Sequence, residues 1–589
     1  MKKTLLLLGI FATLNLPAQI IDTEENILPK GFAPGEEEMM SDYINSINSR
    51  SLTCINSAPA SGNVRALAEW EELQAVVITW TGFTSILTEI VRHAKEECEV
   101  IIVCSNDAVV KNILGGAGID WTTNISFIED DFNSIWVRDY GPNSVYLNDV
   151  ETLAFVDWIY NRPRPKDDLV PEVIADFLGI DNYCTTSVPT DLVHTGGNFM
   201  ADGLGTAFSS RLVLDENDAT NQWGTSNHSE EDVEQIMDDF MGITEYPKMV
   251  VLPYDAIHHI DMHMKLLDEE RLLVGEYPEG IADGPQIEAN IQFVLNNYTT
   301  PYGDPYEIIR VPMPPENGSF PDSGGDYRTY ANAIFLNNTI LVPTYEEQYD
   351  TTGLSIWEEV MPGYNIVGIN CNSMIWASGA LHCITKEIGV NEPLWITHKK
   401  VKTACFDMDT EVTAQIKHIS GISSAKVYYS IDKINWSTSD MANNGDDTFT
   451  ANLASFDIDT EVFYYLEAEA NDGKTITRPL PGAAGAWTFT VEDCSVSTQQ
   501  VENKKAVLLD IFPNPAGAIT CIPVNNNIAV KGSIEVINVL GKKIETVFNG
   551  TIPSGESKYF IDAANYTAGT YFIQLKTENN IQIQKLIVK

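Results

Sequence analysis

The sequence predicts an α/β region followed by two smaller all-β units. In the first part, β-branched runs at 75–80 and 100–104 flank the segment 85–98, whose apolar residues have helical spacing. From about residue 402 onward, short alternating stretches separated by turn residues replace this pattern, as is typical of antiparallel strands. A last stretch of the same kind follows a polar linker. We therefore expect three folded parts in one chain.

The chain opens with the features of a secretory signal peptide, which we assign to 1–19. Two lysines precede the short apolar run 4–12, and Pro17-Ala18-Gln19 offers small-residue cleavage chemistry. This run is too short to span a membrane well, and no other apolar run approaches about 20 residues. We therefore predict an exported protein without a transmembrane segment.

Residues 20–62 are acidic and irregular, and they include Glu36-Glu37-Glu38. We predict that they form a pro-segment or a loosely attached N-terminal arm. The alternative, which the sequence leaves open, is a first helix over about 36–47.

The α/β region is assigned to 63–398. Strand-like runs recur through it, at 152–160, 207–214, 272–275, 334–343 and 366–369. Periodicity alone supports the α/β class and nothing finer.

The segment 399–495 is predicted to be an immunoglobulin-like β-sandwich. It contains alternating runs at 425–430, 449–453 and 461–466, and Asn443-Asn444-Gly445 is one of its turn sequences.

Nine cysteines are few for a disulfide scaffold of 589 residues, and export permits disulfides without requiring them. Cys405 and Cys494 bracket the predicted sandwich, so we expect a bridge between its ends. We interpret four others as ordinary core thiols: Cys98, Cys104, Cys184 and Cys371.

A polar linker, 496–507, leads to a last β unit, 508–589. This unit opens with the sequence FPNP at 512–515, contains GTYFIQL at 569–575 and has a basic end. These features resemble the C-terminal sorting domain of the type IX secretion route. The resemblance implies binding to the secretion machinery and a protein that is secreted or attached to the outer surface. A small carbohydrate-binding or adhesion module is the alternative.

The formal net charge of −47 argues against nucleic acid and anionic membrane as partners. An acidic surface favours cationic ligands such as arginine-bearing peptides. The same charge also serves simply to keep an exported protein soluble, and the sequence does not separate the two readings.

Cys383 lies in the sequence SGALHCIT, 378–385, where small residues let the backbone bend tightly. We interpret it as a nucleophile, which needs a cationic or hydrogen-bonding neighbourhood to react as thiolate near neutral pH. The alternative is an inert core cysteine.

Two other stretches supply groups that suit a cysteine nucleophile. If 258–267 is a strand, its period of two places His259, Asp261 and His263 on one face. The sequence WVRDYGP at 136–142 adds an aromatic side chain and a second carboxylate. Two carboxylates can hold a planar guanidinium while a thiolate attacks its central carbon and a histidine transfers protons.

These stretches, together with TGGNFMADG at 195–203 and YANAIFLNN at 330–338, resemble the guanidino-group-modifying enzymes over roughly 63–495. The resemblance is to the Porphyromonas-type bacterial peptidylarginine deiminases, which neighbour the agmatine deiminases. It implies a five-bladed, pseudo-symmetric α/β propeller with the site in its central channel.

The resemblance also implies a role for each motif residue. Cys383 would form a covalent thiouronium intermediate on the way from peptidyl-arginine to citrulline and ammonia, and His259 would act as general acid and base. Position in the family motif selects His259 over His258 and His263. The substrate guanidinium would be bound by the remaining motif residues, Asp139, Asp261, Trp136 and Asn332. No cofactor and no catalytic metal are implied, and a structural calcium ion is left open.

Arg162 and Arg164 form a stiff basic pair in an otherwise acidic chain. In the family the matching pair binds the carboxylate of a C-terminal arginine, which agmatine lacks. The alternative is a surface patch neutralised by Asp167 and Asp168.

Three other functions remain open at this stage. An agmatine deiminase would use the same chemistry on a small amine. A metal-dependent hydrolase would use His259, Asp261 and His263 as ligands. A surface adhesin would use the sandwich for binding and leave the α/β region inert.

Overall fold

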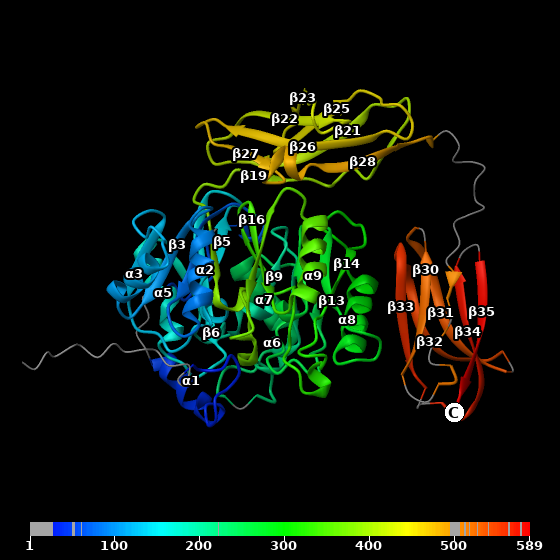
Figure 1. The fold of residues 1–589 in the computed structure, drawn as a ribbon, viewed down its shortest axis with the longest axis horizontal. Helices are drawn as coiled ribbons and strands as arrows, with labels where there is room; N and C mark the ends of the chain where they lie inside the picture. Colours follow the sequence, from blue (N-terminus) through cyan, green and yellow to red (C-terminus); the bar gives the residue numbers. More distant parts are fainter. Residues whose placement is uncertain are drawn as a thin grey trace, which may run out of the picture.

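The structure is a computed structural model (Figure 1). It describes residues 27–49, 54–60, 62–221, 223–494, 507–509, 511, 514–516, 519–526, 528–539, 541–563, 566–577 and 580–589. The predicted signal peptide and the linker residues 496–506 lie outside these ranges.

The α/β region is built from five small sheets, whose strands are as follows. The first contains β18 (Lys386–Gly389), β2 (Leu73–Thr79), β3 (Glu99–Cys104) and β4 (Ile125–Glu129), and the second contains β1 (Val64–Ala66), β5 (Asn143–Leu147), β6 (Thr152–Tyr160), β7 (Asn182–Thr185) and β8 (Val193–His194). The third contains β11 (Lys248–Met249), β10 (Ala207–Ser210) and β9 (Met200–Ala201), the fourth β12 (Met264–Leu266), β13 (Arg271–Glu276) and β14 (Glu307–Pro312), and the fifth β15 (Ile334–Leu336), β16 (Thr339–Thr344) and β17 (Asn365–Asn370).

The five sheets repeat one unit. In each, a strand pairs antiparallel with the next, and a helical connection then returns the chain to a parallel third strand. The connecting helices are α2 (Thr84–Ala94), α5 (Val170–Leu178), α6 (Leu212–Asp215) with α7 (Glu230–Met241), α8 (Gly284–Asn297) and α9 (Glu347–Val360). In the first sheet the antiparallel partner is β18, from the far end of the region, so the chain closes on itself.

The predicted strands at 75–80, 100–104, 152–160, 272–275 and 366–369 are found as β2, β3, β6, β13 and β17, and β2 ends at Thr79, one residue earlier than predicted. Two longer predictions need correction. The run 207–214 is a strand only as far as Ser210, after which the helix α6 begins. The run 334–343 is a hairpin, because Asn337 has a positive φ of 49° and turns the chain between β15 and β16.

The N-terminal arm is packed and helical over part of its length. It contains a 3-10 turn at Glu37–Met39 and the helix α1 (Met40–Ser49). Met40 and Ile44 pack against Ile159 and Val193 of the second sheet. The structure therefore contains a first helix, as in the alternative, at 40–49 rather than 36–47, and the arm is not loosely attached. The interpretation as a pro-segment stays a prediction.

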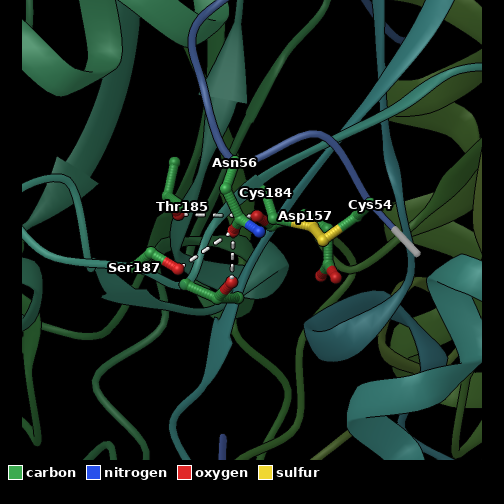
Figure 2. Close-up of a disulfide and its surroundings, with 7 residues drawn as sticks. Cys54, Asn56, Asp157, Cys184, Thr185 and Ser187 are labelled. Atoms are coloured by element: carbon green, nitrogen blue, oxygen red, sulfur yellow. Dashed lines mark hydrogen bonds between the residues drawn. A yellow bond between two sulfur atoms is a disulfide. The ribbon is translucent and has the colours of Figure 1, made fainter. Parts of the chain in front are cut away.

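The arm is also anchored by a disulfide between its Cys54 and Cys184 of β7 (Figure 2). The prediction that Cys184 is a free core thiol is therefore wrong. Backbone bonds between Ile55 and β7 add to this anchor.

The second domain consists of two sheets around a shared apolar core. One contains β19 (Trp395–Thr397), β21 (Thr410–Lys417), β25 (Thr448–Leu453) and β24 (Ala442–Asn443). The other contains β20 (Thr403–Cys405), β28 (Trp487–Glu492), β26 (Glu461–Ala470), β22 (Ile422–Ser430), β23 (Ser437–Asp440) and β27 (Thr475–Arg478). The predicted Cys405–Cys494 disulfide is confirmed.

The last unit is also all β. Its sheets contain β29 (Val507–Leu508), β30 (Ile519–Asn526) and β33 (Gly555–Asp562) on one side, and β32 (Lys543–Ile552), β31 (Val530–Asn538), β34 (Gly569–Thr577) and β35 (Asn580–Val588) on the other. Within the described ranges, no helix is long and apolar enough to cross a membrane.

Candidate active site

Four short segments of the α/β region carry the predicted chemistry. They are α4 (Val137–Tyr140) with Asp139, the turn Gly196–Asn198, the turn Ile260–Met262 with Asp261, and the turn His382–Ile384 with Cys383. All four segments are buried, so their polar groups face one another instead of water.

The stretch 258–267 is not a strand. His258 has a positive φ of 60°, Ile260–Met262 form a 3-10 turn, and only Met264–Leu266 are extended. The prediction that a strand aligns His259, Asp261 and His263 is therefore wrong. His259 and Asp261 still reach the site from this turn. The ring of His263 makes no hydrogen bond with any described residue.

The two carboxylates face a common point. Asp139 Oδ1 accepts a hydrogen bond from the backbone of Gly197 at 3.2 Å. Asp261 Oδ2 lies 3.7 Å from Cys383 Sγ. Burial raises the pKa of Asp139. Burial also acts to raise that of Asp261, but the Lys30 charge and the His382 hydrogen bond outweigh it and hold the Asp261 pKa well below its usual range.

Cys383 is fully buried and has two nitrogen neighbours. Lys30 Nζ donates to its sulfur at 2.8 Å, and Asn332 Nδ2 lies 3.2 Å from the same atom. Burial, reinforced by the Asp261 charge, raises the pKa of the thiol to about 12, although Lys30 opposes this shift. In this state of the molecule Cys383 is a thiol rather than a thiolate.

His259 is buried without a hydrogen bond to either ring nitrogen, within the part of the chain that the structure describes. Its Nδ1 lies 3.5 Å from Asp139 Oδ1. Burial, together with the Lys30 charge, lowers the pKa of His259 well below its usual value. The ring is therefore held in its neutral form, with both nitrogens unbonded among the described residues.

Two glycines leave room that this cluster needs. A Cβ on Gly197 would lie 2.5 Å from His259 Nδ1 and 2.9 Å from Asp139 Oδ1. A Cβ on Gly379 would lie 2.5 Å from the Trp136 ring and 3.1 Å from Cys383 Cβ. The Trp136 ring and the Cys383 side chain therefore both lie against Gly379.

Sequence reasoning missed a pair of residues beneath the site. His382 Nδ1 lies 2.8 Å from Asp261 Oδ2, and its Nε2 lies 3.0 Å from the carboxylate of Glu69. This chain fixes the orientation of Asp261. The position of His382, directly before the predicted nucleophile, was the available signal.

Lys30 was also missed, and it lies at the centre of the cluster. It is fully buried, and its Nζ lies 3.8 Å from Asp139 Oδ1 and 3.9 Å from Asp261 Oδ2, besides its bond to Cys383. Burial acts to lower the pKa of Lys30, but the two carboxylates raise it above its usual value. Lys30 is thus a bound cation.

The arginine pair lies beside Lys30 and is buried, so the alternative of a surface patch is wrong. Arg162 Nε donates to the carbonyl oxygen of Lys30 at 3.1 Å. Arg164 binds both carboxylate oxygens of Glu36, at 3.0 and 2.9 Å, in the paired geometry that arginine favours.

Comparison with known proteins gives the class of the enzyme. A provisionally named agmatine deiminase of Lactococcus lactis is 25% identical over 293 residues, which cover 45% of this chain and 77% of the relative. One of Enterococcus faecalis is 26% identical, with the same coverage. A solved structure of a provisionally named agmatine deiminase has a TM-score of 0.50 at 19% identity and covers 58% of this chain and all of that one, which shows a shared fold. The protein is a deiminase-type hydrolase that acts on guanidino C–N bonds.

The family model gives the assignment within this class. Residues 65–388 match the Porphyromonas-type peptidyl-arginine deiminase, and the chain belongs to this family. Residues 510–589 match the secretion system C-terminal sorting domain, which confirms the predicted sorting unit. The protein is therefore secreted or attached to the outer surface.

Proposed function

We propose that the protein deiminates peptidyl-arginine, with a preference for C-terminal arginine, to citrulline and ammonia through Cys383. One observation carries this proposal: a cation lies 2.8 Å from the Cys383 sulfur and 3.8 and 3.9 Å from the two carboxylates. A substrate guanidinium in the same place meets both a nucleophile and its counter-charges.

In the proposed reaction, Cys383 loses its proton to the neutral His259, and the sulfur attacks the central guanidinium carbon. His259 then protonates a departing nitrogen, which leaves as ammonia, so that a thiouronium joins substrate and enzyme. Water, deprotonated by His259, attacks the same carbon, and the sulfur leaves. The products are citrulline and the free enzyme, and no cofactor takes part.

Asp139 and Asp261 are proposed to bind the terminal nitrogens of the guanidinium. A buried cation is very costly unless it is paired, and two carboxylates meet this need. Asn332 Nδ2, beside the sulfur, is placed to steady the thiolate, and its Oδ1 accepts a bond from the backbone of His382 at 3.1 Å. Trp136 is proposed to wall the guanidinium pocket.

The finer description of the fold also belongs to the proposal. The five repeated units and the closure of β18 onto β2 support a five-bladed, pseudo-symmetric propeller. The two sheets of the second domain support an immunoglobulin-like sandwich.

Peptide rather than agmatine is proposed as substrate because of Arg162 and Arg164. Arg162 binds the main-chain carbonyl of the residue whose side chain enters the site. A C-terminal arginine would present a carboxylate oxygen there, and agmatine would present nothing. A metal-dependent hydrolase that uses His259, Asp261 and His263 as ligands is the other candidate, and loss of activity in chelator would favour it.

The test is a citrulline assay on peptides that end in arginine, the same peptides amidated, and agmatine. It is run on the wild-type chain and on the Lys30→Ala chain, because Lys30 fills the site. We expect the free-acid peptide to be the best substrate and chelators to have no effect. Faster turnover of agmatine would assign the protein to the agmatine reaction instead.

A further inference from the structure

The segment 28–36, which we name the plug, is bound in the site as a peptide would be. Its backbone is held at several points. Trp136 Nε1 donates to the carbonyl of Leu28 at 2.9 Å, and Lys30 N donates to the carbonyl of Ala377 at 3.3 Å. Arg164 Nη2 donates to the carbonyls of Pro29 and Gly31 at 2.8 and 2.9 Å. Side-chain and main-chain groups of the site thus form hydrogen bonds with the backbone on both sides of Lys30.

The side chain of Lys30 occupies the place of a reactive arginine. Counted along the side chain, lysine Nζ and arginine Cζ hold the same position. The atom that thiolate would attack therefore coincides with Lys30 Nζ, 2.8 Å from the Cys383 sulfur. From there a C–N bond of about 1.3 Å brings each terminal nitrogen within hydrogen-bonding distance of a carboxylate, since Asp139 and Asp261 lie 3.8 and 3.9 Å from Nζ.

We propose that the plug is a built-in substrate mimic that keeps the enzyme inactive until it is displaced. This inference rests on the proposed function, since it assigns the guanidinium site to Lys30. The ammonium of Lys30 satisfies the buried carboxylates but offers no electrophilic carbon, so Cys383 cannot react with it. The plug binds as substrate binds and gives no product.

The chain holds the plug in place at its C-terminal end. Glu36 forms the paired salt bridge with Arg164. Arg164 is therefore already occupied and is not available to bind a peptide substrate. Beyond it, α1 is packed on the second sheet, and the Cys54–Cys184 disulfide fixes the chain that follows. Such tethering gives the plug an effective concentration on the order of millimolar. A free peptide competes poorly against it.

The plug also defines a substrate class for the same site. Lys30 is an internal residue, and the chain continues through Gly31 while Arg162 binds the Lys30 carbonyl. The bound state therefore accommodates a chain on both sides of the reactive residue, so that internal arginine can also bind, whereas the preference for C-terminal arginine rests on the stronger bond of Arg162 to a carboxylate. Arginine placed at position 30 should be a substrate within its own chain.

The first test measures kcat/KM on an arginine peptide with three full-length variants. Lys30→Ala should raise it by roughly tenfold or more, because the competing cation is gone. Glu36→Gln should raise it less, and Glu38→Gln, an exposed neighbour of the same chemistry, should leave it unchanged. Equal activity of the wild-type and Lys30→Ala chains would overturn the proposal that the plug inhibits the enzyme. Thermal unfolding checks that each variant is folded.

The second test uses Lys30→Arg, which keeps the positive charge in the site and therefore keeps the chain folded. Mass spectrometry of the peptide spanning 28–36 should show exchange of a guanidine NH for oxygen at position 30. Water supplies this oxygen, and ammonia leaves. The exchange should proceed at a rate independent of protein concentration, because it occurs within one chain. It should be absent from the double variant that carries both Lys30→Arg and Cys383→Ala.

The outcomes separate the two claims. Turnover of external arginine without modification at position 30 would overturn the plug and leave the proposed function standing. Absence of any citrulline, internal or external, from wild-type, Lys30→Ala and Lys30→Arg chains would refute the proposed function, and the plug with it.

Discussion

The centre of the α/β region and the core of the sandwich treat buried histidine differently. His398 in the sandwich bonds with both ring nitrogens, to the Thr413 carbonyl at 2.7 Å and to Tyr464 Oη at 2.9 Å. His259 in the site is as deeply buried but has no hydrogen-bonded partner among the described residues. A satisfied buried histidine serves the fold, whereas an unsatisfied one beside carboxylates is held ready for proton transfer.

The same contrast holds for charge. The sandwich core is formed by apolar side chains from both of its sheets. The site instead buries Lys30, Asp139 and Asp261 together. Because burying charge is costly unless the groups are paired, this concentration of charge indicates a place built to bind a cation.

Cys383→Ala should have the largest effect on turnover. It removes the nucleophile and little volume, so we expect no measurable citrulline and unchanged folding, in both the wild-type and the Lys30→Ala backgrounds. Cys98→Ala is the matched control, since Cys98 is buried and has its pKa raised by burial to about 12, as Cys383 has. Activity of Cys383→Ala within about tenfold of its parent would rule out covalent catalysis at this residue.

His259→Ala should slow turnover by roughly 10²–10⁴-fold, the usual contribution of a positioned acid–base group. His398→Gln should leave kcat unchanged. Steady-state kinetics on both variants in the Lys30→Ala background make this comparison. Equal losses would show that His259 is merely structural.

Asp139→Asn and Asp261→Asn should each lower kcat/KM. We expect a loss of transition-state stabilisation of about 3–5 kcal/mol, the scale for removing one partner of a buried charge pair. The loss arises because one carboxylate cannot neutralise the bound guanidinium alone. Steady-state kinetics on arginine peptides measure it in the Lys30→Ala background, since both carboxylates also bind Lys30 of the plug. Unchanged kcat/KM in both variants would place the cation elsewhere.

Arg162→Ala and Arg164→Ala should each lower kcat/KM on peptides that end in arginine. The expected loss of transition-state stabilisation is about 1.5–3 kcal/mol, the scale of a charged hydrogen bond. Amidated peptides, which keep only the carbonyl, should lose less than free-acid peptides, and agmatine, which has no such group, should lose little. Lys replacements should rescue only part of the loss, because an ammonium lacks the planar fork. The Lys30→Ala background is needed, since both arginines also hold the plug. Equal losses on all three substrates would make the pair structural.

The smallest effect is on stability at mildly acidic pH. Burial lowers the pKa of His398 to about 4 from an ordinary 6.5. Between these values the unfolded chain takes up a proton that the folded chain excludes, so the free energy of unfolding falls as the pH drops. His398→Gln removes this titration and should give a shallower fall of Tm between pH 6.5 and 4. An unchanged slope would show that His398 titrates normally.

Much of the fold and site could be predicted because local signals agreed with the tertiary structure. Long β-branched runs such as 152–160 became strands, and ordered motifs placed Cys383, His259, Asp139 and Asp261 together. The failures came where tertiary contacts override local pattern. The turn at 260–262 has no periodicity to read. Lys30 reaches a cysteine 353 residues away, and no local signal predicts such a contact.

The central claim is that Cys383 attacks the guanidinium carbon, and rapid acid quench during turnover tests it most directly. Arginine peptide is mixed with the wild-type or Lys30→Ala chain, and the digest is examined by mass spectrometry. The account predicts a peptide containing Cys383 that carries the substrate less ammonia, which appears before citrulline and is absent from Cys383→Ala. Steady citrulline production with no adduct on Cys383 at any quench time, or an adduct on another residue, would contradict it.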